Sequence, residues 1–300
     1  MKTAIVKISE GLGNQLFMYA HAYAFAKKKG YKLLIDSTSG YKKIKIRNFL
    51  LDNFNIKINL AKPSDIPDNF FNYIKFKIDK NLDKFRFKKK FLTEIKNQNK
   101  KTKYYDYSKF NYSNKLFIEG YFESEKFFKD YKNDIFNCFK LKNIDENKLY
   151  LDPKILKNEN SVSIVIRQHR FSEKLNSLNN IKKSDLFVKK TINYILEATE
   201  IIKSKIKNPK FYIFSNDIQN LNNLLDEDCF TIINHKDNKP INDFYLSTMC
   251  RHFIVGPSTF HWWSAYLSDN SNKICIRPDD KIQFSSNENI YPDEWLKIKV

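Results

Sequence analysis

The sequence predicts an α/β protein of two domains. Three observations carry this prediction: a length of 300 residues, short β-branched runs that alternate with helical segments, and glycine-rich or polar turns where those runs end. A domain has roughly 150 residues, so the length favours two domains over one. The stretch 145–160 is largely polar and precedes a new strand. We therefore expect domains at 1–150 and 151–300.

The first domain begins with a strand, a helix and a second strand. Residues 3–8 form a β-branched run that stops at a turn containing Gly11 and Gly13. Residues 14–29 are apolar almost all round, which predicts a helix buried on more than one side. A second strand is expected at 32–35. Such a unit has a right-handed crossover and a parallel sheet.

The rest of the first half has a weaker pattern. Residues 63–103 are rich in Phe, Lys and Asn without a clear period, and we expect helices with irregular connections there. A strand is expected at 116–119 and a helix over 124–139.

The second half alternates strands and helices regularly. Strands are expected at 161–166, 210–214, 230–233, 253–255 and 273–276. Helices are expected at 184–206, 221–225, 243–250 and 260–267. This alternation predicts a doubly wound domain, whose ligands bind at the carboxyl ends of the strands.

The composition has a formal net charge of +19. In a nucleic-acid-binding protein the basic residues should cluster on one face. Here the lysines are spread along the chain, with only short runs such as 27–29 and 88–90. A solvated lysine surface is the main interpretation. Attraction toward a phosphorylated substrate, an acidic glycan or an anionic membrane is the alternative.

Cysteine spacing and hydropathy indicate a cytoplasmic protein without a metal site. The four cysteines lie far apart, without a zinc-like spacing, and we expect buried thiols in a reducing compartment. The apolar stretch 12–26 contains polar residues and ends in lysines, unlike a secretory signal. No stretch approaches the roughly 20 apolar residues that a membrane-spanning helix needs.

Two turns that open helices predict anion sites. Residues 11–15 follow the first strand, and their glycines allow close backbone approach to an anion at the helix N-terminus. A tight turn without a ligand is the alternative. The P-loop and the full GxGxxG pattern are both missing. Residues 256–259 form a similar turn that carries two hydroxyls, and a phosphate suits it.

Polar side chains follow two other strands of the second domain. Arg167 and Arg170 follow the strand 161–166. Two arginines can grip a pyrophosphate and stabilise a departing diphosphate, which is otherwise the task of a metal. A pair of surface arginines is the alternative. Asn216 and Asp217 suit recognition of a base or a ribose, and Asp217 equally suits a helix cap.

Four blocks resemble the bacterial alpha-1,2-fucosyltransferase family. They occur in the family's order and span nearly the whole chain: Gly11-Leu12-Gly13-Asn14-Gln15-Leu16-Phe17 with Tyr19-Ala20, then Gly120 to Phe128, Phe214-Ser215-Asn216-Asp217, and Pro257-Ser258-Thr259-Phe260-His261-Trp262-Trp263. The resemblance implies an inverting, metal-independent enzyme. It also implies a GT-B-like fold of two Rossmann-type domains, with an acceptor-side N-terminal domain and the donor site in the C-terminal one.

The resemblance implies roles for residues that bind a GDP-linked donor. Arg167 matches the first arginine of the family's His-x-Arg-Arg-x-Asp motif, which holds the diphosphate. Asn216 and Asp217 fall where related enzymes contact the guanosine. Asp243 sits where wider relatives place a carboxylate on the guanine.

The two helix-opening turns take further roles from the resemblance. Ser258 and Thr259 match the turn that contacts phosphate. Asn14 and Gln15, together with the two glycines before them, belong to the loop that closes on donor and acceptor.

One block departs from the family pattern. The family's histidine is Val165 here, its second arginine is Gln168 and its aspartate is Arg170. Diphosphate binding survives through Arg167 and Arg170, but the donor sugar comes into question. GDP-L-fucose is the default donor, and another GDP-linked deoxy sugar or a heptose is the alternative.

The expected reaction needs a general base, for which Glu173 and His21 are candidates. A helix-surface glutamate and a core histidine are the alternatives. The implied acceptor is a glycan or lipid-linked glycan of a bacterial capsule or lipopolysaccharide, and the basic surface suits peripheral contact with the inner membrane. Two rivals come from other classes: a basic RNA-binding module, and a non-catalytic relative that binds a nucleotide without releasing GDP.

Overall fold

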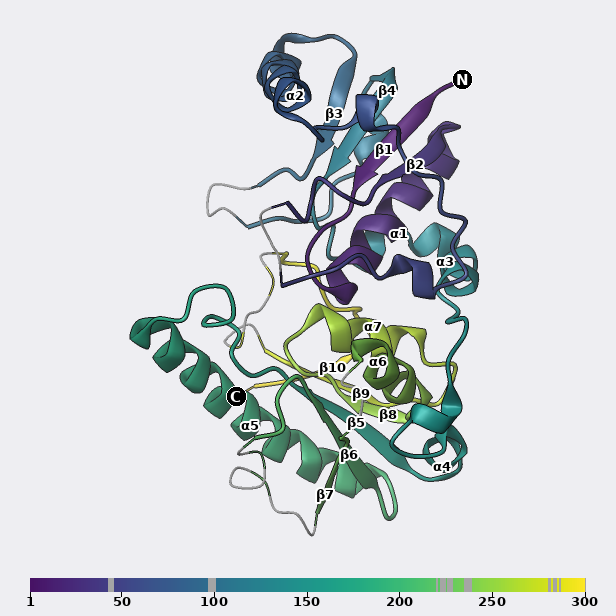
Figure 1. Ribbon diagram of the computed structural model, residues 1–300. Helices are drawn as coiled ribbons and strands as arrows, with labels where there is room; N and C mark the ends of the chain where they lie inside the picture. The colour runs from purple at the N-terminus through teal and green to yellow at the C-terminus, as the bar shows by residue number, and fades with distance from the viewer. Residues whose placement is uncertain are drawn as a thin grey trace. The chain divides into compact units, whose positions relative to one another are not determined.

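The computed structural model describes residues 1–300 except 43–45, 97–100, 220, 222–224, 226–228, 235–238, 280, 281, 283, 284, 286 and 300. It divides into two compact units (Figure 1). The first unit contains Met1–Lys142 and Ser285–Pro292, and the second contains Asn143–Phe284 and Asp293–Val300. The first unit therefore ends eight residues before the expected position, and a C-terminal segment returns to it.

The first unit is built on a four-stranded parallel sheet with the order β2-β1-β4-β3. Its strands are β1 (Thr3–Lys7), β2 (Lys32–Asp36), β3 (Lys89–Thr93) and β4 (Tyr112–Glu119). Helix α1 (Leu12–Lys29) joins β1 to β2, as the sequence predicts, and it is buried along most of its length. Its lysines at 27–29 occupy the last turn, where the helix dipole favours cations.

Two parts of the first unit differ from the sequence prediction. Residues 63–103 hold helix α2 (Phe70–Leu82) but also strand β3, in which Phe91 and Leu92 are buried beside β4. This edge strand was not predicted from the sequence, because it begins in a run of lysines. The helix expected over 124–139 is α3 (Lys132–Cys138) alone, preceded by two 3₁₀ turns at Glu125–Phe127 and Lys129–Tyr131.

The second unit is built on a six-stranded parallel sheet with the order β10-β9-β8-β5-β6-β7. Its strands are β5 (Ser161–Ile166), β6 (Lys210–Ser215), β7 (Phe230–Ile232), β8 (His252–Ile254), β9 (Cys275–Pro278) and β10 (Leu296–Ile298). Its helices are α4 (Pro153–Asn158), α5 (Leu178–Lys205), α6 (Pro240–Met249) and α7 (Thr259–Leu267). The order is that of a doubly wound Rossmann-type sheet.

The five strands predicted for the second half are confirmed within two residues at each end, and only the short edge strand β10 was missed. Helix α5 begins six residues before the expected start, because the Ser177 side chain caps it by accepting from the Asn180 N–H at 3.4 Å. The helix expected at 221–225 lies largely outside the described residues.

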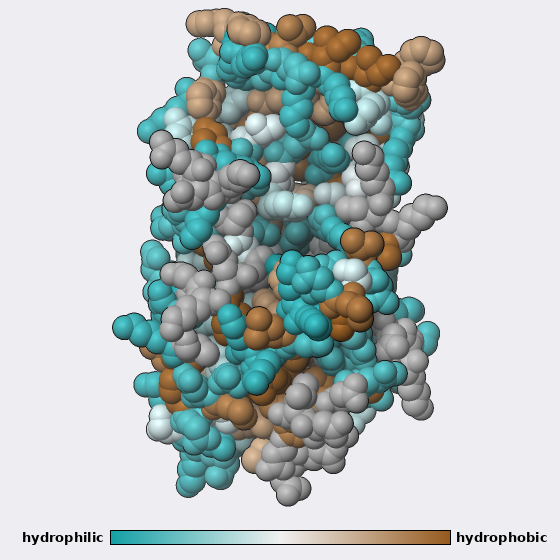
Figure 2. All heavy atoms as spheres, turned by 90° about the vertical axis from the view of Figure 1, so that its left-hand side faces the viewer, coloured by the Kyte–Doolittle hydropathy of each residue, from teal (hydrophilic) through white to brown (hydrophobic). Residues whose placement is uncertain are grey.

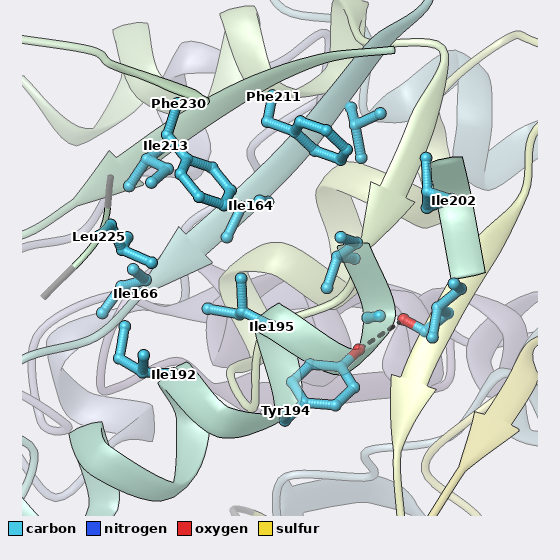
Figure 3. Close-up of a cluster of buried hydrophobic side chains, with 14 of the residues drawn as sticks. Ile164, Ile166, Ile192, Tyr194, Ile195, Ile202, Phe211, Ile213, Leu225 and Phe230 are labelled. Atoms are coloured by element: carbon cyan, nitrogen blue, oxygen red, sulfur yellow. Dashed lines mark hydrogen bonds between the residues drawn. The ribbon is translucent and has the colours of Figure 1, made fainter. Parts of the chain in front are cut away.

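Alternation along β5 divides the second unit into layers. Val162, Ile164 and Ile166 pack with α5 in one hydrophobic cluster (Figure 3). The intervening Ser163 bonds to residues of α6 and α7 on the opposite face. Because strand side chains alternate between faces, one strand anchors helices on both sides. Full burial of each such isoleucine stabilises the fold by about 2 kcal/mol.

Candidate functional site

Each sheet has one topological switch point. In the first unit the chain runs outward from β1 to β2 on one side, while β4 and β3 lie on the other. In the second unit β6 and β7 lie on one side of β5, and β8, β9 and β10 lie on the other. Ligands of open α/β sheets bind at the carboxyl ends of the strands at such a point. The loops after β1, β4, β5 and β8 are therefore the candidate site segments.

Strained backbone marks three of these four loops. Five non-glycine residues of the described chain have positive φ, and two are asparagines, which tolerate it. The other three are Glu10 after β1, Phe122 after β4 and His169 after β5, with φ of 64°, 52° and 55°. Such outliers cluster at functional sites, where the surrounding structure holds them in place.

The loops after β5 and β8 come into close contact. A Cβ on Gly256 would lie 2.1 Å from the Val165 carbonyl oxygen, so only glycine fits between these strand ends. Ser258 follows and caps α7, its hydroxyl accepting from the His261 N–H at 3.2 Å. The N-terminus of α7 therefore begins directly beside the end of β5, and its first N–H groups and dipole favour an anion there.

A buried hydrogen-bond chain fixes this arrangement. The Gly256 N–H donates to Nδ1 of His261 at 2.8 Å, so Nε2 carries the proton and donates to the Ser163 hydroxyl at 3.1 Å. Ser163 in turn lies 2.8 Å from the Ser247 hydroxyl on α6. Burial lowers the pKa of His261 to about 3, which keeps the ring neutral. His261 stands in the last of the four motifs, and the sequence pattern predicted no role for it.

Arg167 directly follows β5 and is held by Glu173. The Arg167 Nη2 donates to Glu173 Oε2 at 2.7 Å, and both side chains remain partly exposed. Glu173 lies in the loop between β5 and α5, so the helix-surface alternative for this residue was wrong. The loop after β5 therefore presents a guanidinium that is paired with the Glu173 carboxylate.

Asn216 and Asp217 follow β6 and hold the loop after β5. The Asn216 side chain accepts from the Gln168 N–H at 2.8 Å and donates to the Gln168 carbonyl at 3.2 Å. Asp217 Oδ2 lies 2.8 Å from His169 Nε2. The bond to His169 is the largest cause of the lowered pKa of Asp217. His169 and Gln168 are functional candidates that the sequence analysis left without a role of this kind.

The remaining donor-side candidates occupy different surroundings. Arg170 lies with its guanidinium 5.2 Å from the ring centroid of Phe187 and 5.8 Å from that of Phe171. Stacking of this kind orients an arginine without neutralising it. Asp243 is half-buried in the first turn of α6, and Thr259 is half-buried at the start of α7.

In the first unit, Gln15 braces the glycine loop. Its amide is fully buried, donates to the Glu10 and Asn48 carbonyls at 2.9 and 2.8 Å, and accepts from the Leu50 N–H at 2.9 Å. The Gln15 side chain thus links the glycine loop to residues 48–50 by hydrogen bonds. Gly13 is buried in the first turn of α1 and Asn14 is half-buried there.

Gly11 is not explained by the packing of the described protein. It has a φ of −76°, which any residue adopts, and a Cβ on it would approach only Arg47 Nε, at 3.9 Å, among the described atoms. A glycine that neither backbone nor neighbours require is consistent with close approach of a ligand.

His21 lies in an aromatic cluster of the first unit. Its ring stacks on Phe122 with centroids 3.8 Å apart, and the rings of Phe127 and Tyr107 meet it edge-on. It is 3% exposed, and burial lowers its pKa to about 3. The core-histidine alternative describes this position better than the role of general base.

A half-buried glutamate in the first unit gave no signal in the sequence. Glu94 accepts the N–H groups of Tyr121 and Phe122 at 2.8 and 2.7 Å, which fixes the turn after β4. Burial raises its pKa. It lies in the region of irregular pattern, and only its contact with a turn 28 residues away defines its role.

Three whole-chain expectations can be compared with the described residues. Cys250 and Cys275 are buried, but Cys229 is exposed and Cys138 half-buried, so the expectation of four buried thiols was wrong. Within the described ranges, no helix combines the length and apolar character needed to cross a bilayer. No group of three His, Cys, Asp or Glu side chains suited to a metal ion occurs in the same ranges.

The two parallel α/β sheets, each with one topological switch point, are those of the GT-B fold class. The family model of Glycosyl transferase family 11 matches residues 3–299, and the chain belongs to this family. It is 26% identical over 313 residues to an alpha-1,2-colitosyltransferase of Escherichia coli, covering all of both chains. It is 22% identical to the E. coli O-antigen biosynthesis glycosyltransferase WbnK, covering 97% of this chain and 99% of that one.

Solved structures confirm the fold. The fucosyltransferase NodZ from Bradyrhizobium matches with a TM-score of 0.50 and 14% identity, over 88% of this chain and 93% of that one. Arabidopsis thaliana FUT1 in complex with GDP matches with a TM-score of 0.51 and 14% identity, over 94% and 72%. The predicted GT-B-like class of two Rossmann-type domains is therefore confirmed, as is the resemblance to this fucosyltransferase family.

Proposed function

We propose that the protein takes a sugar from a GDP-linked donor, by default GDP-L-fucose, and transfers it with inversion to a hydroxyl of a bacterial surface glycan. The observation that carries this proposal is that Arg167 follows β5 at the switch point where Gly256 packs against the end of β5 and the chain turns into α7. A cation and a helix N-terminus together suit a diphosphate. The O-antigen relative and the GDP complex of the FUT1 structure support the acceptor class and the nucleotide.

The donor-binding roles follow the loops of the second unit. Arg167, with Arg170, neutralises the diphosphate, and Ser258 and Thr259 present the first turn of α7 to it. The guanosine contacts the loop after β6 at Asn216 and Asp217, and Asp243 contacts the guanine. In this proposal Asn216 also acts indirectly, because its amide positions the backbone beside Arg167.

The first unit supplies the acceptor side. Gly11, Gly13 and Asn14 form the loop that approaches the sugars, and Gln15 holds that loop through its three backbone hydrogen bonds. Among the described atoms only Arg47 Nε would come within 4 Å of a Cβ on Gly11, which supports this assignment, since a ligand would then require the glycine.

In the proposed reaction a base removes the proton of the acceptor hydroxyl, whose oxygen attacks the anomeric carbon opposite the diphosphate. The bond from that carbon to the diphosphate oxygen breaks, and its electron pair leaves with GDP. Arg167 stabilises this growing negative charge. Of the two base candidates we favour Glu173, because the His21 ring is enclosed by aromatic side chains. Diphosphate binding would draw Arg167 away from the Glu173 carboxylate.

Thermal unfolding with GDP, UDP, CDP or ADP, each with EDTA, tests the donor class. A nucleotide at about 100 times its Kd adds roughly 2.7 kcal/mol, which raises Tm by several degrees. GDP should stabilise the protein most, and Arg167→Ala should lose most of that gain. Arg251→Ala is the matched control, because Arg251 directly precedes β8 and so lies at the amino ends of the strands, opposite the candidate site. Equal shifts for UDP and GDP, or an unchanged shift in Arg167→Ala, would refute the proposal.

The two candidate roles of Glu173 predict different kinetics for Glu173→Gln. If Glu173 is the general base, the variant should lose the limb of the kcat pH profile that titration of this base causes. Its kcat should fall by about 10²–10⁴ with little change in donor KM. A residue that only positions Arg167 would raise the donor KM and leave the pH profile of kcat in place. A variant with unchanged kcat and KM would exclude both roles.

A different GDP-linked sugar is the second candidate donor. The motif around Arg167 lacks the family's histidine and aspartate, and one 26%-identical relative is named for the transfer of colitose. Release of GDP from a panel of GDP-linked deoxy sugars and heptoses, with glycan acceptors, identifies the donor. Binding of GDP without release from any donor would instead support the non-catalytic alternative.

A further inference from the structure

Helix α2 of the first unit contacts the sheet through an unusually small part of its surface. Phe76 is the aromatic contact, with its ring centroid 4.9 Å from that of Phe91 and 5.0 Å from that of Phe117. The other half-buried residues of the helix are Asn72 and Asp79, four residues before and three after Phe76. No residue of α2 is fully buried.

A second apolar stripe runs along α2 on the side that Phe76 does not occupy. Phe71, Ile74, Ile78 and Leu82 follow one another at spacings of three, four and four residues, and all four are exposed. Residues at this spacing share one helix face. Since the apolar face of an amphipathic helix normally packs on the core, the outward stripe calls for another partner.

The turn after α2 extends this stripe. Phe85 and Phe87 are 78% and 83% exposed, and Phe70 at the start of the helix is 71% exposed. Among the described residues, four of the five exposed phenylalanines lie in this one segment. We call Phe70, Phe71, Ile74, Ile78, Leu82, Phe85 and Phe87 the α2 face. Figure 2 shows hydrophobic residues gathered at the top of the view, and α2 lies at the top of Figure 1.

The α2 face is accompanied by an excess of positive charge. Residues 70–90 contain eight lysines and arginines and two aspartates, a net charge of +6. The Lys84 ammonium lies 4.8 Å from the ring centroid of Phe85, and Lys77 lies 4.8 Å from that of Tyr73. Long basic side chains beside aromatic rings can keep their charges at a polar boundary while the rings enter an apolar phase.

We propose that the α2 face is a membrane-docking surface that lies in the headgroup region of an anionic bilayer. An amphipathic helix with phenylalanines on its apolar side and lysines beside them is suited to that interface. The lysines are attracted to an anionic surface, whereas a second copy of the chain would bring two segments of +6 together. The docking itself is independent of the proposed reaction. Given that reaction, it would hold the enzyme at the surface that carries a lipid-linked acceptor.

Sedimentation with large vesicles tests the proposal without donor or acceptor. The wild-type protein should sediment with vesicles that contain phosphatidylglycerol and much less with vesicles of phosphatidylcholine alone. The triple variant Phe71→Ser, Phe85→Ser, Phe87→Ser should lose at least tenfold in affinity for the phosphatidylglycerol vesicles. The double variant Ile155→Ser, Leu196→Ser is the matched control, since it removes exposed apolar side chains of the second unit, and it should bind as the wild type does.

Three results would overturn the proposal. They are absence of wild-type binding to the anionic vesicles, equal binding by the wild type and the triple variant, and a wild-type dimer that the triple variant converts to a monomer. The last result would assign the α2 face to a second copy of the chain. GDP should stabilise the wild type and the triple variant equally. This measurement separates a failure of docking from a failure of the proposed function.

Discussion

The buried ring of His261 should make the stability of the second unit depend on pH. The side chain is fully buried, and burial lowers its pKa from 6.5 to about 3. Below pH 6.5 the unfolded chain therefore binds a proton that the folded chain excludes. Stability is complete above about pH 6.5 and is lost progressively as the pH falls from there toward 3. At pH 5 the loss from this one group is about 2 kcal/mol relative to pH 7.

The assay can be confined to the second unit. All three tryptophans of the chain, Trp262, Trp263 and Trp295, belong to that unit, so urea unfolding followed by tryptophan fluorescence reports on it. The free energy of unfolding should fall between pH 7 and pH 5 by about 2 kcal/mol more in the wild type than in His261→Gln. His252, whose pKa burial also lowers, is present in both proteins and cancels in the comparison.

A matched variant separates titration from loss of packing. Ser247→Ala removes a hydroxyl from the same hydrogen-bond chain but keeps the histidine, so its pH dependence should equal that of the wild type. If His261→Gln and the wild type lost the same free energy between pH 7 and pH 5, the argument that His261 is buried neutral would be refuted.

Substitutions at three further positions test how the two candidate loops are held. Gly256→Ala should cost about 3 kcal/mol or more in urea unfolding, because its Cβ would lie 2.1 Å from the Val165 carbonyl oxygen; a cost below 1 kcal/mol would contradict the close approach. Ser258→Ala should cost about 1 kcal/mol by the same assay, and Ser258→Asp should restore most of it, unless the hydroxyl does not cap α7. Gln15→Ala removes three hydrogen bonds to backbone groups, and faster amide hydrogen exchange at residues 48–50 should reveal it; unchanged exchange would argue against the brace.

Local pattern was sufficient for the central strands and for the polar residues that follow them. β5 and β1 are short β-branched runs, and such runs are typical of buried strands in a parallel sheet. Arg167 and the turn before α7 were found in the same way, since a polar residue directly after a buried strand lies at the sheet edge where ligands bind.

The same local pattern failed where packing overrides composition. Strand β3 lies in a lysine-rich stretch and is a strand because Phe91 and Leu92 meet β4, a contact that propensity does not encode. The outward apolar stripe of α2 shows the converse. No clear period was recognised there from the sequence, and only the position of Phe76 against the sheet reveals that this stripe points away.

The class of fold, the family and the order of the loops that carry polar side chains could be read from the sequence, because they follow from periodicity and from short motifs. The hydrogen-bond partners of those side chains could not. In the structure Gln15 and Asn216 bond to backbone groups, Arg167 pairs with Glu173, and His21 lies among aromatic rings. A hydrogen bond needs an approach of about 3 Å in a defined direction, and the packing of the sheets sets which distant partner meets this need.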